Sequence, residues 1–537
     1  MSDRSQIKKY KRYYNSIDSG NSEDENLTDS YKNALISNLT SIYDNPKRKK
    51  SSEGSDLKPT ESRIEFVKNI LSSVSLKPMI KLENCDTEKA SEIRLGKTII
   101  DAKELFTSMN VTLRYLKSGT TGHTFKAVST LNKDIAFAVK VCAYPKDDYG
   151  GIYNLSRPEN AEIIMLKLLG PLVIKQCTPH LVLPIYTFNT SITNFVNIPP
   201  SVINLQDREK NSSYRKFLER YKDKEFEDFV SVLISEWCSG GDLSEYLKKN
   251  YRTMSLKHWT VIIFQILFTL AKIHSVHKAF RHNDMKANNI LVHQTEVNGT
   301  NYGYDLGDIK FIIPNINLQI KIWDFDFACI EGVVENNKVN SDWTKKMNIS
   351  KRENKYYDMH YFLNTLSRFF PQLYTSNRIP REVIEFIYRV IPEKYRSIPE
   401  EYRSVLDKYY NLVKHFKFPP KKHQYLLKQY DMLSKEQKII VDNYCSLIEK
   451  NGYIPEKYGY VCEKYHALPE QYQVVTDRYV QLYEEYCEIP QKYKDYYKYV
   501  NTRGRIMVNI EYTTPYKVIM EDPLFKDYRF PKSMAKV

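Results

Sequence analysis

Residues 282–292 are His-Asn-Asp-Met-Lys-Ala-Asn-Asn-Ile-Leu-Val, and residues 321–326 are Lys-Ile-Trp-Asp-Phe-Asp. Asp284 can accept a proton, while Asn289 and Asp324 carry the oxygen ligands that Mg²⁺ prefers. Asp324 follows a predicted apolar strand, which would hold its carboxylate in place. Transfer of a phosphoryl group requires a carboxylate at the attacking hydroxyl and oxygen ligands for the metal. These two segments therefore predict phosphoryl-transfer chemistry.

The chain before these segments has the alternating pattern of strands. Such alternation flanks the stretch Ser118-Gly119-Thr120-Thr121-Gly122 and continues to Lys140. Glycines let backbone N–H groups approach a phosphate closely, although two glycines in a β-turn-β more often belong to an ordinary hairpin. Helices are predicted over 159–170 and 259–274, with a strand over 230–235 between them. Strands first and helices afterwards is the order of a two-lobed α+β enzyme.

Residues 282–292 and 321–326 resemble the catalytic loop and the metal-binding motif of the protein kinases. The resemblance covers about Val111 to Leu366 and implies a bilobal α+β fold, with a β-rich N-lobe and a helical C-lobe. It implies an enzyme that transfers the γ-phosphate of Mg-ATP to protein substrates, with Asp284 as the base. Lys286 points to serine or threonine as the acceptor.

The same resemblance assigns roles outside the catalytic loop. Lys140 would hold the α- and β-phosphates and pair with Glu162, whereas a lone lysine at a strand end is usually only solvated. Residues 235–243 look like the kinase hinge, and a stack of Leu166, Phe325 and His282 would cross between the lobes. The implied ATP contacts are Leu116, Ser118, Gly119, Gly122, Thr124, Ala138, Lys140, the backbone of Glu236 and Cys238, and Asp242 near the ribose. The implied magnesium ligands are Asn289 and Asp324.

Four features depart from the protein-kinase pattern. The arginine of the catalytic loop is Asn283, the glycine of the metal motif is Asp326, and the first glycine of the loop is Lys117. No Ala-Pro-Glu precedes Asp358, which resembles the buried aspartate that opens a long C-lobe helix. These features are similar to the serine/threonine kinases of large nucleocytoplasmic DNA viruses, such as the poxvirus virion-assembly kinases. That likeness implies a kinase of the host cytoplasm that virions can carry.

Two other classes remain open. Small-molecule phosphotransferases of the aminoglycoside or choline kinase type share a looser catalytic motif and often end the metal strand in Asp-x-Asp. Lys286 and the Gly240-Gly241-Asp242 step argue against that class. A pseudokinase scaffold would bind partners without catalysis. The filled positions Lys140, Glu162, Asp284, Asn289 and Asp324 argue against a pseudokinase.

Composition restricts the partners and the compartment. The 537 residues carry a formal charge of +15, but no long basic stripe indicates a nucleic-acid site. The eight cysteines show no zinc spacing, and we expect reduced thiols in a cytoplasmic protein. The strongest apolar stretch, Val261–Leu270, is far shorter than the ~20 residues of a membrane span. We therefore expect a buried helix there and no transmembrane segment.

A heptad repeat occupies residues 391–495. An aliphatic residue recurs at every seventh position from Ile391, and a tyrosine often follows four residues later, as at Tyr395. Prolines after the aliphatic position, such as Pro392, would break a continuous coiled coil. We expect a stack of short helices inserted in the C-lobe, which is either a docking surface for a partner or a self-packed spacer.

The expected organisation follows from these segments. It comprises a disordered tail (1–60), a helical N-terminal extension (61–104), the N-lobe (105–238), the C-lobe (239–390), the heptad insertion (391–495) and a segment that closes the C-lobe (496–537).

Overall fold

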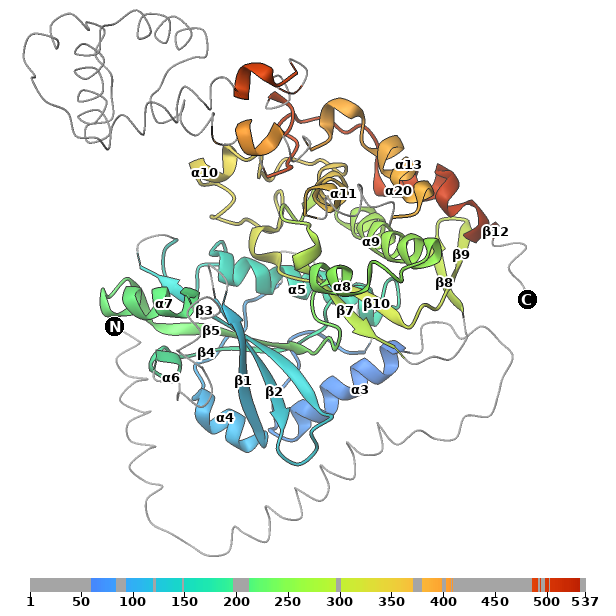
Figure 1. Ribbon diagram of the computed structural model, residues 1–537. Helices are drawn as coiled ribbons and strands as arrows, with labels where there is room; N and C mark the ends of the chain where they lie inside the picture. Colours follow the sequence, from blue (N-terminus) through green and yellow to red (C-terminus); the bar gives the residue numbers. More distant parts are fainter. Residues whose placement is uncertain are drawn as a thin grey trace, which may run out of the picture.

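An antiparallel sheet of five strands forms the first part of the molecule (Figure 1). Its order is β1-β2-β3-β5-β4. The strands span Val111–Ser118 (β1), His123–Ser129 (β2), Ala136–Pro145 (β3), Pro184–Ser191 (β4) and Phe226–Glu236 (β5). This computed structural model describes residues 59–83, 93–118, 122–146, 149–196, 212–295, 301–369, 379–397, 402–406, 408, 485–490, 493, 498–501 and 503–531.

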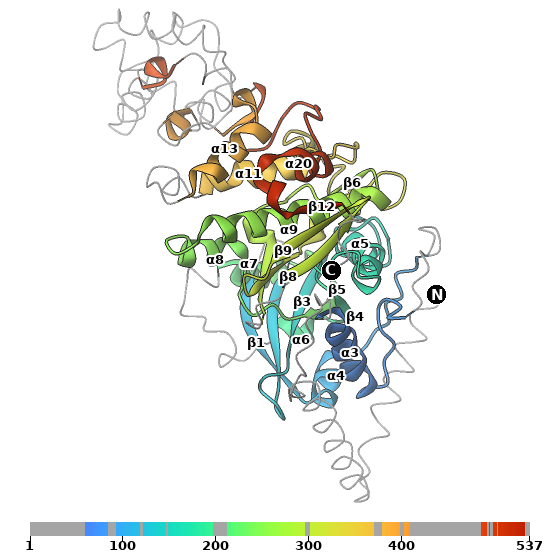
Figure 2. The same ribbon diagram turned by 90° about the vertical axis from the view of Figure 1, so that its right-hand side faces the viewer.

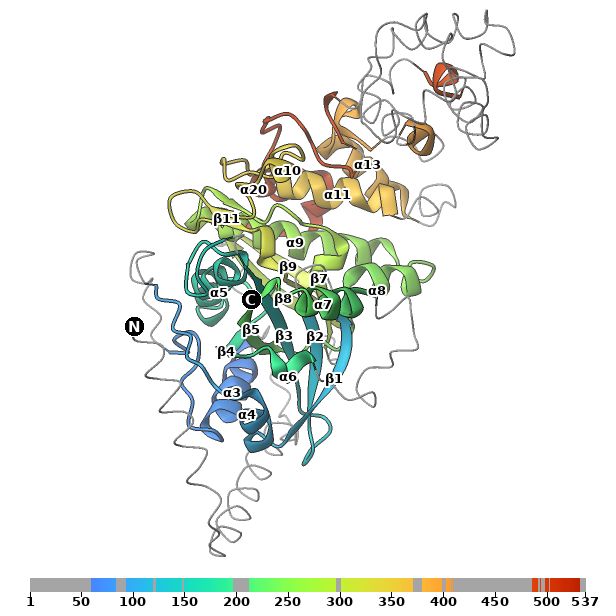
Figure 3. The ribbon, with the colours of Figure 1, turned by 90° about the vertical axis from the view of Figure 1, so that its left-hand side faces the viewer.

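The central strands are apolar along their length because both faces of the sheet are covered. β3 has the sequence Ala-Phe-Ala-Val-Lys-Val-Cys-Ala-Tyr-Pro, and almost all of it is buried. One long helix, α5 (Pro158–Ile174), packs against β4 and against the 3-10 turn η3 (Phe325–Phe327) of the second part. Figure 3 shows α5 beside the sheet, at the level where the sheet meets the helical part. This helix therefore carries its side chains to the junction of the two parts.

The N-terminal extension is only partly helical. Helix α3 (Pro59–Ser72) packs on α5, and helix α4 (Ala102–Ser108) packs on β1. The described residues between them contain no further helix. Asp101 caps α4 by accepting hydrogen bonds from the backbone of Lys103 and Glu104, which explains why the helix starts there. Two short helices that the sequence pattern did not indicate, α6 (Thr193–Val196) and α7 (Ser212–Lys222), lie between β4 and β5.

The second part is built around helix α9 (Leu256–Val276). It is apolar on nearly every side and buried for most of its length, as expected of a core helix. Among the described residues it is the one helix long and apolar enough to cross a membrane, and 83% of its most apolar stretch is buried inside the protein. The same part contains α8 (Leu243–Asn250), α10 (Asp342–Lys345), α11 (Tyr357–Phe369), α13 (Arg381–Val390), which packs on α9, and the short turn η4 (Glu393–Tyr395).

Short strands hold the segments between α9 and α11. β6 (Phe280–Arg281) pairs with β11 (Cys329–Ile330), and β7 (Ile290–Gln294) pairs with β10 (Leu318–Ile322). The 3-10 turn η2 (Ala287–Asn289) lies just before β7. The two ladders bring residues 282–289 and 323–327 together, because each of these segments is flanked by strands that pair with the strands flanking the other.

The C-terminal segment closes the second part. A hairpin of β8 (Asn301–Leu306) and β9 (Ile309–Pro314) lies between β7 and β10 in sequence, and β12 (Arg529–Pro531) adds to its edge (Figure 2). Helix α20 (Pro515–Glu521) packs on α9, and Phe525 of η6 (Pro523–Tyr528) contacts the rings of Phe264 and Phe386 at 5.9 and 5.6 Å between centroids. The α+β fold with a β-rich first part and a helical second part is thus confirmed.

Most of the heptad repeat lies outside the described residues, so the expected helical stack stays a prediction. Its described ends are packed. Ile391 and Tyr395 are buried in the same core as α9, and the backbone carbonyl of Tyr395 accepts a hydrogen bond from His360 at 2.7 Å. Tyr402 and Tyr493 stack with 4.9 Å between ring centroids. The first heptad therefore packs as part of the second lobe, and the two ends of the repeat lie side by side.

Candidate active site

Three charged side chains meet where the two parts join. Lys140 of β3 donates to both carboxylate oxygens of Glu162 on α5 at 2.8 Å, and to Oδ1 of Asp324 at 2.9 Å. Glu162 and Lys140 are almost fully buried, whereas the Asp324 side chain is 36% exposed. Residues 184 positions apart in the chain, Lys140 and Asp324, are thus brought into contact by the fold. The expected pairing of Lys140 with Glu162 is present.

The charges of this cluster depend on one another. Burial alone would lower the pKa of Lys140, but the carboxylates of Asp324 and Glu162 hold it well above its usual range. Burial opposes ionisation of Asp324 too, yet Lys140 lowers its pKa to about 2. For Glu162 burial is the larger effect, and it raises the pKa to about 7 against the attraction of Lys140. Lys140 stays charged in this setting, and Asp324 stays ionised throughout the neutral range.

Asp358, the second residue of α11, binds the backbone of the catalytic-loop candidate. Its carboxylate accepts the backbone N–H groups of His282 at 2.7 Å and Asn283 at 2.8 Å. Asn283 has φ +63°, a left-handed conformation that asparagine tolerates better than most residues. The buried aspartate expected at 358 is therefore present, and it fixes the backbone immediately before Asp284.

Asp284 itself is surrounded by hydrogen-bond donors. Its Oδ2 accepts from Nδ2 of Asn289 at 2.8 Å and lies 2.8 Å from Nζ of Lys286. Its Oδ1 contacts the guanidinium of Arg505. The carboxylate is thereby held in one orientation, with its oxygens assigned to different partners.

The two candidate magnesium ligands come from neighbouring segments, since the backbone N–H of Trp323 donates to the carbonyl of Asn289 at 3.1 Å. Both amide hydrogens of Asn289 are engaged, by the backbone carbonyl and the carboxylate of Asp284, so its Oδ1 is left to accept. Asp324 uses Oδ1 for Lys140 and has left-handed backbone angles, φ 64° and ψ 67°. No cluster of three His, Cys, Asp or Glu that could bind a metal occurs among the described residues. Mg²⁺ commonly binds through one or two protein ligands plus substrate phosphates, so Asn289 and Asp324 fit a metal that arrives with a nucleotide.

The expected stack between the lobes is partly visible. The rings of His282 and Phe325 lie 5.2 Å apart, and Nε2 of His282 is 3.0 Å from the carbonyl oxygen of Trp323. Leu166 is buried on α5, the helix that packs on η3. Phe325 is buried within that turn. The arrangement keeps Asp324 pointed toward Lys140.

Three of the four residues or motifs that depart from the kinase pattern make local contacts. Asp326 lies in the turn η3, where glycine is not required, and it pairs with buried Lys338. Lys117 lies 3.3 Å from Asp242. Asn283 donates through Nδ2 to the carbonyls of Phe327 at 3.0 Å and Ser350 at 3.1 Å. Neutral hydrogen bonds thus hold the segment between the metal motif and Asp358 against the catalytic loop.

The structure describes most of the predicted nucleotide contacts, and several of them lie on the five-stranded sheet. Gly119 lies outside the described residues. A Cβ on Gly122 would meet the carbonyl oxygen of Val141 at 2.5 Å, so this glycine allows the loop to lie close against β3. Leu116, Ser118 and Thr124 lie on β1 and β2, and Ala138 lies on β3 opposite Ser235 of β5.

The hinge candidate is shaped by a contact that the sequence did not indicate. The carboxylate of Glu236 binds Arg63 of α3 at 2.7 Å and the backbone N–H of Leu183 at 2.8 Å. The backbone N–H of Glu236 also donates to the carbonyl of Leu183 at 3.1 Å, so only its own carbonyl remains to meet an adenine. Asp242 caps α8 through Oδ1, which accepts from the backbone of Glu245. The N-terminal helix therefore holds the hinge.

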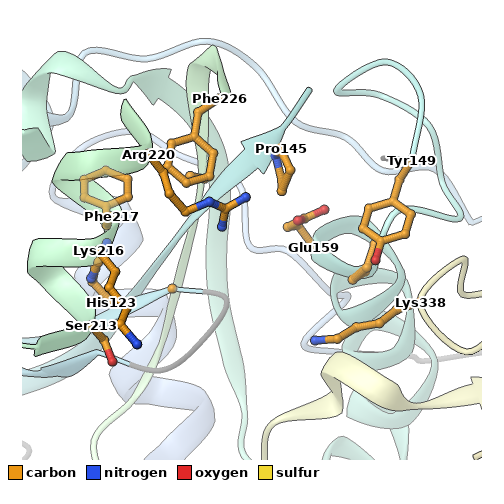
Figure 4. A pocket seen from close by; sticks show the side chains of 13 residues that line it. His123, Pro145, Tyr149, Glu159, Ser213, Lys216, Phe217, Arg220, Phe226 and Lys338 are labelled. Atoms are coloured by element: carbon orange, nitrogen blue, oxygen red, sulfur yellow. The ribbon is translucent and has the colours of Figure 1, made fainter. Parts of the chain in front are cut away.

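A separate cavity of about 330 Å³ lies between α7, the end of β3 and the start of α5. In Figure 4 the side chains of Arg220, Glu159 and Lys338 point toward one another across it. Gly122 is the one predicted nucleotide contact that lines this cavity. The cavity is therefore distinct from the cluster around Lys140.

Two buried arginines of the site were not predicted from the sequence. Arg505 comes from the C-terminal segment, 221 positions after Asp284. Arg281 donates to Oγ of Ser350 at 2.7 Å and to the carbonyl of Asn348 at 3.0 Å. Its place directly before His282 could have marked it, but nothing in the pattern around Arg505 could have done so.

Comparisons with known proteins agree with this geometry. The family model "Poxvirus serine/threonine protein kinase" matches residues 187–415. The chain is 47% identical over 512 residues to "Putative serine/threonine-protein kinase R400" of Acanthamoeba polyphaga mimivirus, covering 94% of this chain and 87% of that protein. It is 27% identical over 138 residues to serine/threonine-protein kinase 2 of fowlpox virus, covering 25% of this chain and 29% of that protein. For the kinase of the same name in vaccinia virus strain Ankara the identity is 31% over 108 residues, covering 20% and 22%.

Proposed function

Because this chain belongs to the serine/threonine protein kinase family that mimivirus and the poxviruses share, we propose that it transfers the γ-phosphate of Mg-ATP through Asp284, Lys140, Asn289 and Asp324. The observation that carries the proposal is the cluster in which Lys140 bonds to Glu162 and to Asp324 at once. The charges of this cluster serve only a bound triphosphate and the metal that the triphosphate carries. A pseudokinase therefore has no need of the cluster.

Each side chain has a task that its contacts support. When bound, Mg-ATP supplies the phosphoryl group and the metal charge that offsets its oxygens. Lys140, kept charged by its two carboxylate neighbours, binds phosphate oxygens. Glu162 fixes the position of Lys140, and Oδ1 of Asn289 with the free oxygen of Asp324 forms the protein's share of the metal site.

Asp284 orients the acceptor hydroxyl and takes its proton. A carboxylate offers about four acceptor positions, two on each oxygen. Oδ2 already accepts from Asn289 and Lys286, and Oδ1 accepts from Arg505 alone among the residues that the structure describes. One position on Oδ1 therefore remains for the hydroxyl of the substrate. Lys286 beside it can neutralise the oxygens of the transferred group, which favours serine or threonine acceptors.

Protein substrates and the host cytoplasm complete the proposal. The described cysteines are free, namely Cys142, Cys177, Cys238, Cys329 and Cys487, which supports a reducing compartment. Carriage in virions and a docking role for the heptad repeat remain parts of the proposal that the relatives' names do not address.

The decisive test is Asp284→Asn. This change should lower phosphate transfer to a generic protein acceptor by about 1,000-fold, while the dissociation constant of ATP changes by less than about threefold. Labelled ATP with a protein, an aminoglycoside or no acceptor distinguishes the reaction classes. Transfer to the aminoglycoside alone, or undiminished transfer by the variant, would refute the assignment. A matched control is Asp305→Asn on the β8 strand, which should leave the rate unchanged.

A further inference from the structure

Arg505 contacts the proposed base, and the proposed reaction does not yet use it. It is buried, and its guanidinium makes three polar contacts: Asp284 Oδ1, the backbone carbonyl of Asn283, and the hydroxyl of Tyr357 at 3.0 Å. The ring of Tyr361 lies 4.0 Å from it on one side. One side chain therefore holds both the base, Asp284, and the residue before it, Asn283.

A short turn delivers this arginine. Val500 and Ile506 form an antiparallel bridge, and the backbone N–H of Arg505 donates to the side chain of Asn501 at 3.0 Å. The turn is tied to α11 by Asn364, which donates to the carbonyl of Gly504 at 2.9 Å. It is tied to the segment after the metal motif by Asn348, which donates to the carbonyl of Ile506 at 2.7 Å. The backbone around Arg505 is thus fixed from two sides.

We propose that Arg505 is a positioning residue for Asp284, which it holds by a charged fork from the C-terminal side of the heptad repeat. The inference rests on the proposed role of Asp284. An arginine fork fixes a carboxylate more firmly than a single-point donor does, because it combines charge with two directed N–H groups. Here one N–H group binds the carboxylate and the other binds the peptide just before it. Arg505 therefore fixes the position of the Asp284 carboxylate relative to the backbone of the same loop.

The contacts of Arg505 leave Asp284 able to accept the substrate hydroxyl. Arg505 occupies one acceptor position of Oδ1 and leaves the other for the hydroxyl of the substrate. Misplacement of a reacting group by about 1 Å costs on the order of 100-fold in rate. Loss of Arg505 should therefore lower kcat, while ATP binding through Lys140 and the hinge stays as it is.

The test uses the full chain and a double-mutant cycle. Arg505→Met should lower kcat by about 100-fold, with the ATP dissociation constant within about threefold of the parent. Exposed Arg503, in the same turn, is the matched control: Arg503→Gln should leave kcat within about twofold. In an Asp284→Asn background, Arg505→Met should change the residual rate by less than about threefold, because Arg505 acts through Asp284. Arg505→Lys should recover part of kcat.

Each outcome decides the matter. A further loss of the full factor in the Asp284→Asn background, or an unchanged kcat in Arg505→Met, overturns the inference and leaves the proposed function standing. An undiminished rate in Asp284→Asn alone overturns the proposed function instead. If Arg505→Met fails to bind ATP, Tyr357→Phe takes its place, since it removes one anchor of the guanidinium and keeps the ring. That variant should lose about three- to tenfold in kcat, and no loss would count against Arg505.

Discussion

At the scale of single residues, buried lysines carry a part of the stability that depends on pH. Lys97 is buried and donates to Tyr144 Oη at 2.9 Å, Asn160 Oδ1 at 2.8 Å and Ser231 Oγ at 2.6 Å. Burial lowers its pKa to about 7. Lys321 is buried under the hinge and has its pKa lowered to about 7 for the same reason. In the described part of the chain, no carboxylate oxygen lies within 4 Å of the Nζ atom of either lysine.

A lowered pKa has a definite sign in stability. Between about pH 7 and pH 10 the unfolded chain keeps the proton on Lys97 and the folded chain does not, so the free energy of unfolding rises with pH. Lys97→Met removes the proton that the unfolded chain binds in this range. The slope of the unfolding free energy against pH should therefore fall by up to about 1.4 kcal/mol per pH unit. Urea denaturation at about pH 7, 8 and 9 measures the slope.

The control for this prediction is Lys133→Met at an exposed position, which should leave the slope as it is in the parent. Parallel curves for Lys97→Met and the parent would show that Lys97 is charged in the folded protein at all of these pH values.

At the scale of elements, the segment between the metal motif and α11 is fastened without a phosphate. Asn283 and Arg281 bind it through the hydrogen bonds to Phe327, Ser350 and Asn348 described above. In kinases with arginine before the catalytic aspartate, a phosphate on this segment commonly neutralises that charge. Asn283 is uncharged, and its bonds go directly to the backbone.

We therefore expect the purified enzyme to keep its activity after treatment with a broad-specificity phosphatase. The change in kcat should stay within about twofold, less than ~0.5 kcal/mol of barrier. Asn283→Ala, by contrast, removes the hydrogen bonds to the carbonyls of Phe327 and Ser350, about 1 kcal/mol each, and should lower kcat and the melting temperature together. A rate that falls sharply on dephosphorylation and returns with autophosphorylation would contradict this view of the segment.

The elements of the site could be predicted from the sequence where a motif is local. Asp284 and Asn289 lie within one loop, Lys140 lies within a recognisable strand, and Asp324 follows another, so the resemblance to protein kinases could place all four in one site. Arg505 is one of 80 lysines and arginines, with no spacing to distinguish it. Arg63 has no such spacing either. Their roles come from packing between distant segments, which local periodicity does not encode.

At the scale of the whole molecule, the heptad repeat enters and leaves the second lobe through packed residues. Ile391, Tyr395, Leu406 and Ile489 are buried, and Tyr402 stacks on Tyr493. A cut at the predicted boundary of residue 391 would remove Ile391 and Tyr395 from the core. Burial of such side chains is worth roughly 1.5–3 kcal/mol each, so that deletion should lower stability markedly.

Removal of residues 409–484 alone should be tolerated. A Gly/Ser linker of about ten residues in their place keeps both packed ends and the turn that carries Arg505. We expect ATP hydrolysis and phosphorylation of a generic acceptor within about tenfold of the parent, or ~1.4 kcal/mol of barrier. Phosphorylation of the physiological substrate should fall further if the repeat is a docking surface. An insoluble or inactive product would assign the deleted residues to the catalytic core.

The position of Arg505 along the chain also orders events during translation. A ribosome has made the catalytic loop, the metal motif and the whole heptad repeat before it reaches residue 505, and the strand that closes the lobe, β12, follows later still. A growing chain can therefore fold its nucleotide cleft while its base is still unsupported. On this arrangement, chains that end after the heptad repeat but before residue 505 carry Lys140, Asn289 and Asp324 and lack the arginine that holds Asp284.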